Sequence, residues 1–170
     1  MRALYILVAS TLCGLAATSC SVDEGAPVDP VGAADAELKA QFPPVASMLS
    51  RRCGTIDCHG SKYRNFRVYG FGGIRLDPID TPEKPEQTTK LEADATYEGL
   101  LSLEPEIMRR VIDARAAGRE QLTLYRKARG DEDHKGDRLW ASGDDADLCF
   151  ATWLARTTDV AKCDAATKAK

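Results

Sequence analysis

Two cysteines and a histidine within one short stretch are the residues of this chain with the most evident chemistry. The stretch runs Cys-Gly-Thr-Ile-Asp-Cys-His from Cys53 to His59. Two thiols followed at once by an imidazole can hold haem covalently, through two thioether bonds and a bond from histidine to iron. The usual motif has two residues between the cysteines, whereas this one has four, and Gly54 and Asp57 allow the extra residues to bulge. We therefore expect one covalent haem c, bound by Cys53, Cys58 and His59.

The N-terminus predicts export from the cytoplasm. Met1-Arg2 is a short positive start, and the apolar run that follows it is too short to form a stable transmembrane helix. The run ends in Ala17-Thr18-Ser19-Cys20, which resembles the lipobox of bacterial lipoproteins. We expect residues 1–19 to be a cleaved signal and Cys20 to carry lipid, which would anchor the protein to a membrane of the cell envelope, facing the periplasm or the outside. An ordinary signal peptide is the alternative, and it too leads to an oxidising compartment, where covalent haem is attached.

The other cysteines fit an exported chain. Cys13 would leave with the signal, which leaves Cys149 and Cys163 near the C-terminus. We expect these two to form a disulfide that stabilises the fold by roughly 3 kcal/mol in the chain-entropy model.

Composition and apolar spacing divide the chain into a tether and one domain. Residues 20–40 are rich in Gly, Ala, Pro and Asp and predict a flexible tether, residues 41–165 a single domain, and residues 166–170 a tail. We expect a mainly α fold with a short β-hairpin within residues 63–76.

Three helices are predicted from prolines, caps and apolar spacing. One begins at Pro43-Pro44 and leads into Cys53, and a second begins at Pro105. Asp144 can cap a last helix, which we expect to pack on the first. The apolar residues on these helices are Val45, Met48 and Leu49, then Ile107, Met108, Val111 and Ile112, then Leu148, Phe150, Trp153 and Leu154.

A resemblance joins the motif to the second half of the chain. The stretch from Arg52 to Gly60 looks like the attachment site of c-type cytochromes in a longer-spaced form. The later runs, Leu-Thr-Leu-Tyr-Arg-Lys-Ala from Leu122, His-Lys-Gly-Asp from His134 and Trp153-Leu154, are similar to planctomycete-type cytochrome c domains. The resemblance implies a small helical haem domain that works in electron transfer.

The second axial ligand of the iron has three conventional candidates. Met48 and Met108 lie on apolar helix faces, where packing explains them, whereas His134 lies in a charged loop and matches the His-x-Gly loop of the resembling family. We expect His134 to be the distal ligand, with Met108 and an open or water-bound position as the alternatives.

Other interpretations of these residues stay open. Cys53 and Cys58 can form a disulfide, which would make the protein a haem-free lipoprotein domain with a structural or binding role. A zinc site would use the same cysteines and one histidine, but export and the lack of a second cysteine pair argue against it. Three arginines after the motif can neutralise haem propionates or be solvated charges: Arg64, Arg67 and Arg75.

Charge and the missing motifs exclude several function classes. The formal net charge is −3 and both signs are interspersed, so nothing predicts a nucleic-acid partner. The sequence has no recognisable catalytic triad or phosphate-binding loop. We therefore expect an electron carrier with a redox protein partner rather than an enzyme.

Overall fold

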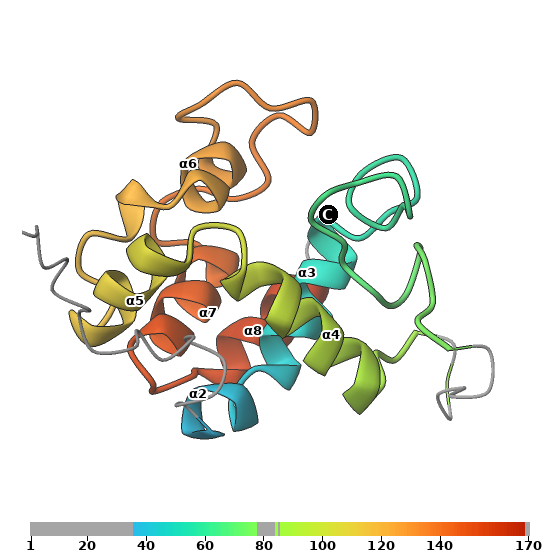
Figure 1. Ribbon diagram of the computed structural model, residues 1–170, viewed down its shortest axis with the longest axis horizontal. Coiled ribbons are helices and arrows are strands. Elements are labelled where there is room, and N and C mark those ends of the chain that lie inside the picture. Colours follow the sequence, from blue (N-terminus) through green and yellow to red (C-terminus); the bar gives the residue numbers. More distant parts are fainter. Residues whose placement is uncertain (1–35, 78–83, 85, 169–170) are drawn as a thin grey trace, which may run out of the picture.

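The computed structural model describes residues 36–77, 84 and 86–168, and all regular structure in these residues is helical (Figure 1). This confirms the expected mainly α fold. The elements in chain order are α2 (Ala36–Ala40), α3 (Pro43–Arg52), α4 (Lys90–Leu101), α5 (Pro105–Asp113), the 3₁₀ turn η1 (Arg119–Gln121), α6 (Thr123–Arg129), α7 (Asp145–Leu154) and α8 (Val160–Lys168).

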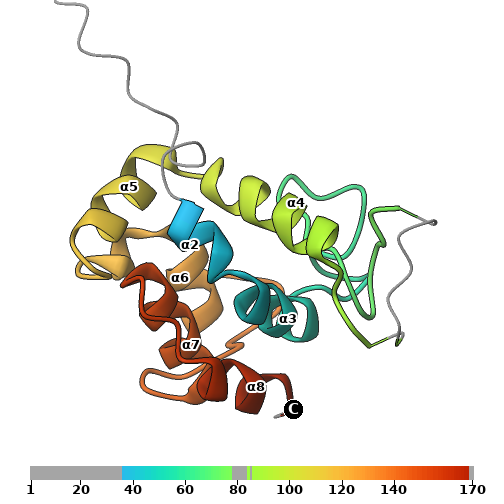
Figure 2. The ribbon, with the colours of Figure 1, turned by 90° about the horizontal axis from the view of Figure 1, so that it is seen from below.

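Helix α3 lies at the centre of the bundle and leads into the cysteine motif. It begins at Pro43-Pro44. Proline suits this position because amide hydrogens in the first turn of a helix have no partner within the helix, and proline has no amide hydrogen. Its apolar face is fully buried, and it contacts α4, α7 and α8 (Figure 2). The predicted packing between the helix capped by Asp144 and the helix from Pro43 is thus present in the contact between α7 and α3.

Helix α4 has 12 residues and begins with a well-defined first turn. Its first turn is fixed by a capping box, in which the side chain of Thr89 accepts from the Glu92 amide and the Glu92 carboxylate accepts from the Thr89 amide. Glu92 is buried, and its carboxylate also pairs with Arg75 at 2.7 Å. The pair ties the segment that follows the cysteine motif to α4.

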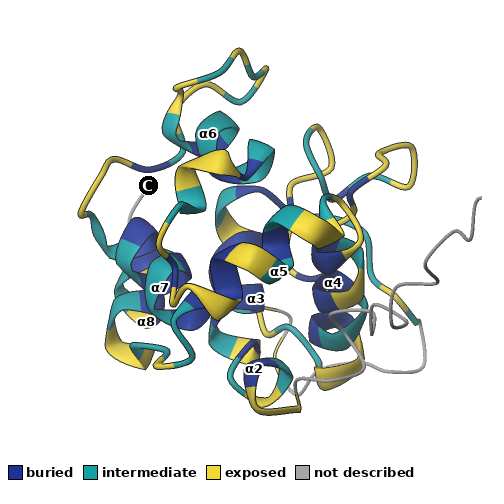
Figure 3. Cartoon of the chain, turned by 60° about the vertical axis from the view of Figure 1, so that its left-hand side comes forward, coloured by how far each residue is buried: buried dark blue, intermediate teal, exposed yellow. Residues whose placement is uncertain are grey.

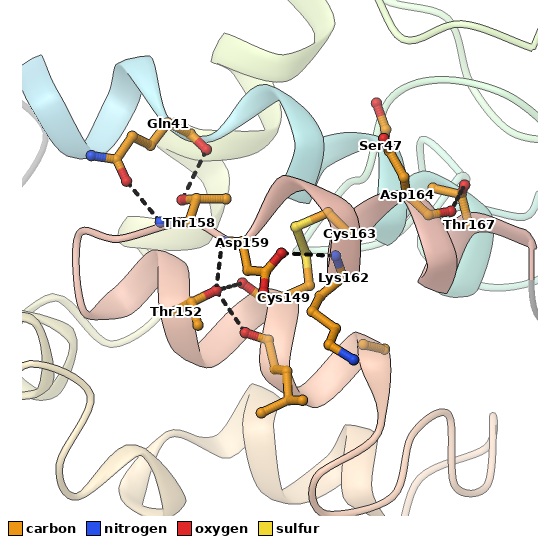
Figure 4. Close-up of a disulfide and its surroundings, with 12 residues drawn as sticks. Gln41, Ser47, Cys149, Thr152, Thr158, Asp159, Lys162, Cys163, Asp164 and Thr167 are labelled. Atoms are coloured by element: carbon orange, nitrogen blue, oxygen red, sulfur yellow. Dashed lines mark hydrogen bonds between the residues drawn. A yellow bond between two sulfur atoms is a disulfide. The ribbon is translucent and has the colours of Figure 1, made fainter.

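The last two helices are joined by the predicted disulfide. The Asp144 side chain caps α7 by accepting from the amides of Ala146 and Asp147. Cys149 on α7 is bonded to Cys163 on α8 (Figure 4). Helix α8 runs into the residues expected to form a tail, because Ala166 is buried and its carbonyl oxygen accepts from the Arg52 guanidinium.

The folded unit also begins earlier than predicted. Helix α2 falls within residues 20–40, which we expected to be tether, yet Leu38 is completely buried. The indole nitrogen of Trp153 donates to the Leu38 carbonyl oxygen at 3.0 Å. Buried residues of α2, α3 and α4 form one core with those of α7 (Figure 3).

The predicted β-hairpin is wrong. Residues 63–76 form turns and bends without a strand. Their amides and carbonyls bond to the cysteine motif rather than across a hairpin: Val68 donates to the His59 carbonyl oxygen, and Ile74 donates to that of Gly60. The segment is therefore an irregular loop that wraps the motif.

Candidate functional site

The cysteine motif folds back on itself at the end of α3. The amide of Cys53 donates to the Leu49 carbonyl oxygen and closes the helix. The amide of His59 then donates to the Cys53 carbonyl oxygen at 2.9 Å, although six positions separate the two residues. The four residues between the cysteines form the bulge that the long spacing requires, and Cys53 and His59 are brought together.

Glycines make this compact loop possible. A Cβ atom on Gly73 would lie 2.0 Å from the carbonyl oxygen of Gly54 and 2.7 Å from the Cα atom of Gly60. No side chain fits in such a space, so the backbone of the wrapping loop lies directly on that of the motif. Gly60 thus lets the wrapping loop lie directly against the motif.

A pocket of about 540 Å³ opens beside the motif. One wall comes from the motif and the residues after it, and the other from α6 and the loop that follows α6. Figure 1 shows these two regions on the same side of the helical bundle. The lining residues used below are Cys53, His59, Arg64, Phe66, His134 and Trp140.

The ring of His59 is oriented by the backbone. Its Nδ1 lies 3.0 Å from the carbonyl oxygen of Phe66, and because a carbonyl only accepts, Nδ1 carries the proton and donates. The lone pair is then on Nε2, as in metal-binding histidines whose other nitrogen donates to a carbonyl. Burial lowers the pKa of His59 and outweighs the Phe66 hydrogen bond, which raises it. The lowered pKa favours the neutral imidazole, the form that can bind a metal.

The second histidine lies beside the first. The ring centroids of His59 and His134 are 6.0 Å apart and the ring planes are inclined by 19°. One metal held by both imidazoles would need about 6 Å between the ring centres, from metal–nitrogen bonds of about 2 Å and about 1 Å from each nitrogen to its ring centre. Nδ1 of His134 is buried without a hydrogen-bond partner in the described part of the chain, and Gly136 lies against the ring, since a Cβ there would be 3.0 Å from Cε1.

Trp140 is a pocket residue that the sequence analysis missed. Its side chain is 2% exposed, and its indole nitrogen has no hydrogen-bond partner among the described residues. A buried donor without an acceptor costs roughly 1–3 kcal/mol, so this nitrogen fits an acceptor on a bound group. The sequence held one signal that could have found it, a tryptophan placed shortly after the His-x-Gly loop.

The two motif cysteines are free thiols in different surroundings. Cys53 is buried and lines the pocket, and burial raises the pKa of its thiol to about 12. Cys58 is half-buried and is not among the lining residues. The disulfide between Cys53 and Cys58, on which the haem-free alternative depended, is not formed.

Most of the remaining candidates lie outside the pocket. Met48 and Met108 are buried in α3 and α5, and neither lines it. Of the three arginines considered for propionates, Arg64 lines the pocket, Arg67 does not, and Arg75 is paired with Glu92. Cys20 lies outside the described residues.

Comparisons with known proteins do not assign the chain to a family. No protein-family model matches it, and no significant similarity to a curated protein or to a solved structure was found. Within the described residues, no group of three or more His, Cys, Asp or Glu side chains is placed to hold a metal ion. Across that same part of the chain, no helix has the length and apolar character needed to cross a membrane.

Proposed function

We propose that this protein is a c-type cytochrome-like electron carrier with one covalent haem, anchored by lipid outside the cytoplasm. The observation that carries the proposal is the placement of His59 and His134 around one pocket, at a centroid separation of 6.0 Å. The same pocket is lined by Cys53, the first thiol of the motif. A structural disulfide in this loop would need neither of the two histidines.

Each residue of the site has a distinct role in this proposal. Cys53 and Cys58 would hold the haem through their sulfurs, and His59 and His134 would hold its iron through ring nitrogens. The bound haem supplies one-electron chemistry, with a potential set by axial ligands and burial. The Phe66 carbonyl holds the proton on Nδ1 of His59 and so leaves Nε2 as the nitrogen that would bind the iron.

Polar groups in the pocket fit the acidic edge of the cofactor. The indole nitrogen of Trp140 can donate to a propionate, and the guanidinium of Arg64 at the pocket wall can neutralise one. Arg64 also donates to the carbonyl oxygens of Cys58 and Asp57, at 3.2 and 3.1 Å. These bonds link the arginine to the loop that carries the second thioether.

The experiment that tests this proposal is expression in a host with a c-type cytochrome maturation system, followed by visible spectroscopy. A red protein with sharp bands in the reduced state is the expected result. A matched variant, Met108→Leu, should be equally red, because Met108 is not in the pocket. A colourless wild-type protein would instead favour a haem-free domain with a structural or binding role.

The lipid anchor has a test of its own. Cys20 should be acylated, because small residues precede it and several acyl chains are needed for stable anchoring. Cys20→Ala should leave the protein unprocessed or in the aqueous phase after detergent partitioning. Partitioning identical to that of the wild type would reject the anchor without affecting the haem proposal.

A further inference from the structure

The loop that carries the motif has a charge opposite to that of the whole chain. Residues 51–76 contain six Arg or Lys and one acidic residue, Asp57, whereas the chain has a formal net charge of −3. Two of the six basic side chains bond to residues outside this loop. Arg52 donates to the carbonyl oxygens of Ala166 and Leu139, and Arg75 pairs with Glu92.

The other four basic side chains face solvent. Arg51, Lys62, Arg64 and Arg67 are all exposed, and none forms an ion pair with a carboxylate of the described residues. Oppositely charged neighbours neutralise cations elsewhere on this protein, as in the pairs of Lys39 with Glu98 and Arg126 with Glu132. No carboxylate of the described residues therefore neutralises these four cations, and they can attract an external anion.

Large apolar side chains are exposed among these cations. Tyr63 is 83% exposed and Ile56 is 69% exposed, more than any other large apolar residue described. Each of the two has a neighbour within this loop. The Lys62 ammonium lies 5.1 Å from the centre of the Tyr63 ring. The Ile56 amide donates to the Gly72 carbonyl oxygen, and the Arg51 guanidinium stacks 3.9 Å from the centre of the adjacent Phe71 ring. Exposed aromatic and apolar groups ringed by charge are typical of protein interfaces.

We propose that this surface docks an acidic protein partner. It consists of Arg51, Lys62, Arg64 and Arg67 with Ile56 and Tyr63, and we name it the basic loop face. Tyr63 and Arg64 also line the pocket, so a partner seated here lies next to the cofactor site. This inference rests on the proposed function, because an electron carrier needs a redox partner that approaches the cofactor site. We favour a protein over a membrane as the partner because a lipid surface would cover that site.

Binding of an acidic polypeptide tests the basic loop face directly. The probe is poly-L-glutamate of fixed length, titrated at low salt into the mature protein and followed by calorimetry. The wild type should bind, and binding should weaken steeply with added salt, because exposed charges are screened. Arg67→Glu should weaken binding about fivefold, since one charge reversal at a surface changes the interaction by about 1 kcal/mol.

A matched reversal on another part of the surface provides the control. Arg110 is exposed and forms no ion pair within the described residues. It is part of α5, a helix that lies away from the loop in Figure 1. Arg110→Glu makes the same change in net charge and should leave binding within twofold of the wild type. Equal loss in both variants, or no binding by the wild type, would overturn the proposal.

Two further outcomes separate this inference from its alternatives. Tighter binding to phosphatidylglycerol vesicles than to polyglutamate, lost in Arg67→Glu, would assign the face to a membrane and overturn the protein partner. The titration needs no haem, so a colourless protein that still binds polyglutamate through this face would refute the proposed function and leave the acidic partner supported.

Discussion

The backbone of Gly60 passes so close to that of Gly54 that a Cβ atom on Gly60 would lie 1.9 Å from the Gly54 carbonyl oxygen. This contact fixes the chain reversal directly after His59. Gly60→Ala must push the two backbones apart, and we expect it to destabilise the fold by at least about 2 kcal/mol. Urea denaturation of the mature protein measures the change.

Gly99 is the matched control for that substitution. It lies within α4, and a Cβ there would meet its nearest neighbour, the Phe66 ring, at an ordinary 3.8 Å. Gly99→Ala should be neutral or stabilising by up to about 1 kcal/mol, because alanine favours a helix more than glycine does. Equal stability of the two variants would show that the backbone contact at Gly60 is not rigid.

The distal ligand is tested by changing its chemistry. In the haem-loaded protein, His134→Met should raise the reduction potential by on the order of 0.1 V, because a thioether stabilises the reduced iron more than imidazole does. Redox titration measures this shift. Met108→Leu should leave potential and spectrum unchanged, and the reverse pattern would show that methionine is the ligand.

The stability of the haem-free protein should depend on Cys53 in alkaline solution. A cysteine thiol has an ordinary pKa of 9.0, and burial raises the pKa of Cys53 in the fold to about 12. Between these values the unfolded state loses the proton that the folded state keeps, so stability falls as pH rises, by up to about 1.4 kcal/mol per pH unit. Denaturation between about pH 8 and about pH 11 should show a steeper fall in the reduced wild type than in Cys53→Ala. Parallel curves would contradict the buried placement of this thiol.

The disulfide between Cys149 and Cys163 should stabilise the packing of α7 against α8. Its two cysteines are 14 positions apart. A loop of this size restricts the unfolded chain and so stabilises the folded state by about 3 kcal/mol. The double variant Cys149→Ala and Cys163→Ala should lose about this much in free energy of unfolding. A denaturation midpoint equal to that of the wild type would show that helix packing alone holds α8.

Local signals predicted α3, α5 and α7 but not the loops between the helices. Asp144 and the prolines at 43 and 105 act within one helical turn, so their effect is visible in the sequence. The hairpin was predicted from alternating apolar residues. Residues 63–76 instead bond to the motif, because Gly54, Gly60 and Gly73 allow the two backbones to touch. Such contacts depend on distant residues, which no local pattern reports.

The same distinction applies to the candidate site. The spacing from Cys53 to His59 and the His-x-Gly loop pointed to the two histidines that the structure places together. The carbonyl group of Phe66 that orients His59 belongs to the backbone, so no residue type in the sequence could predict its role. Trp140 was overlooked because its role depends on a pocket that forms only when α6 and its following loop pack opposite the motif.

The central claim is covalent haem at Cys53 and Cys58, and the intact mass of the denatured protein tests it most directly. After co-expression with maturation factors, the wild-type chain should gain the mass of one haem, which should survive denaturation. The variant Cys53→Ser with Cys58→Ser should show the mass of the bare polypeptide. A wild-type chain without added haem, produced in cells that load a control cytochrome, would contradict the account.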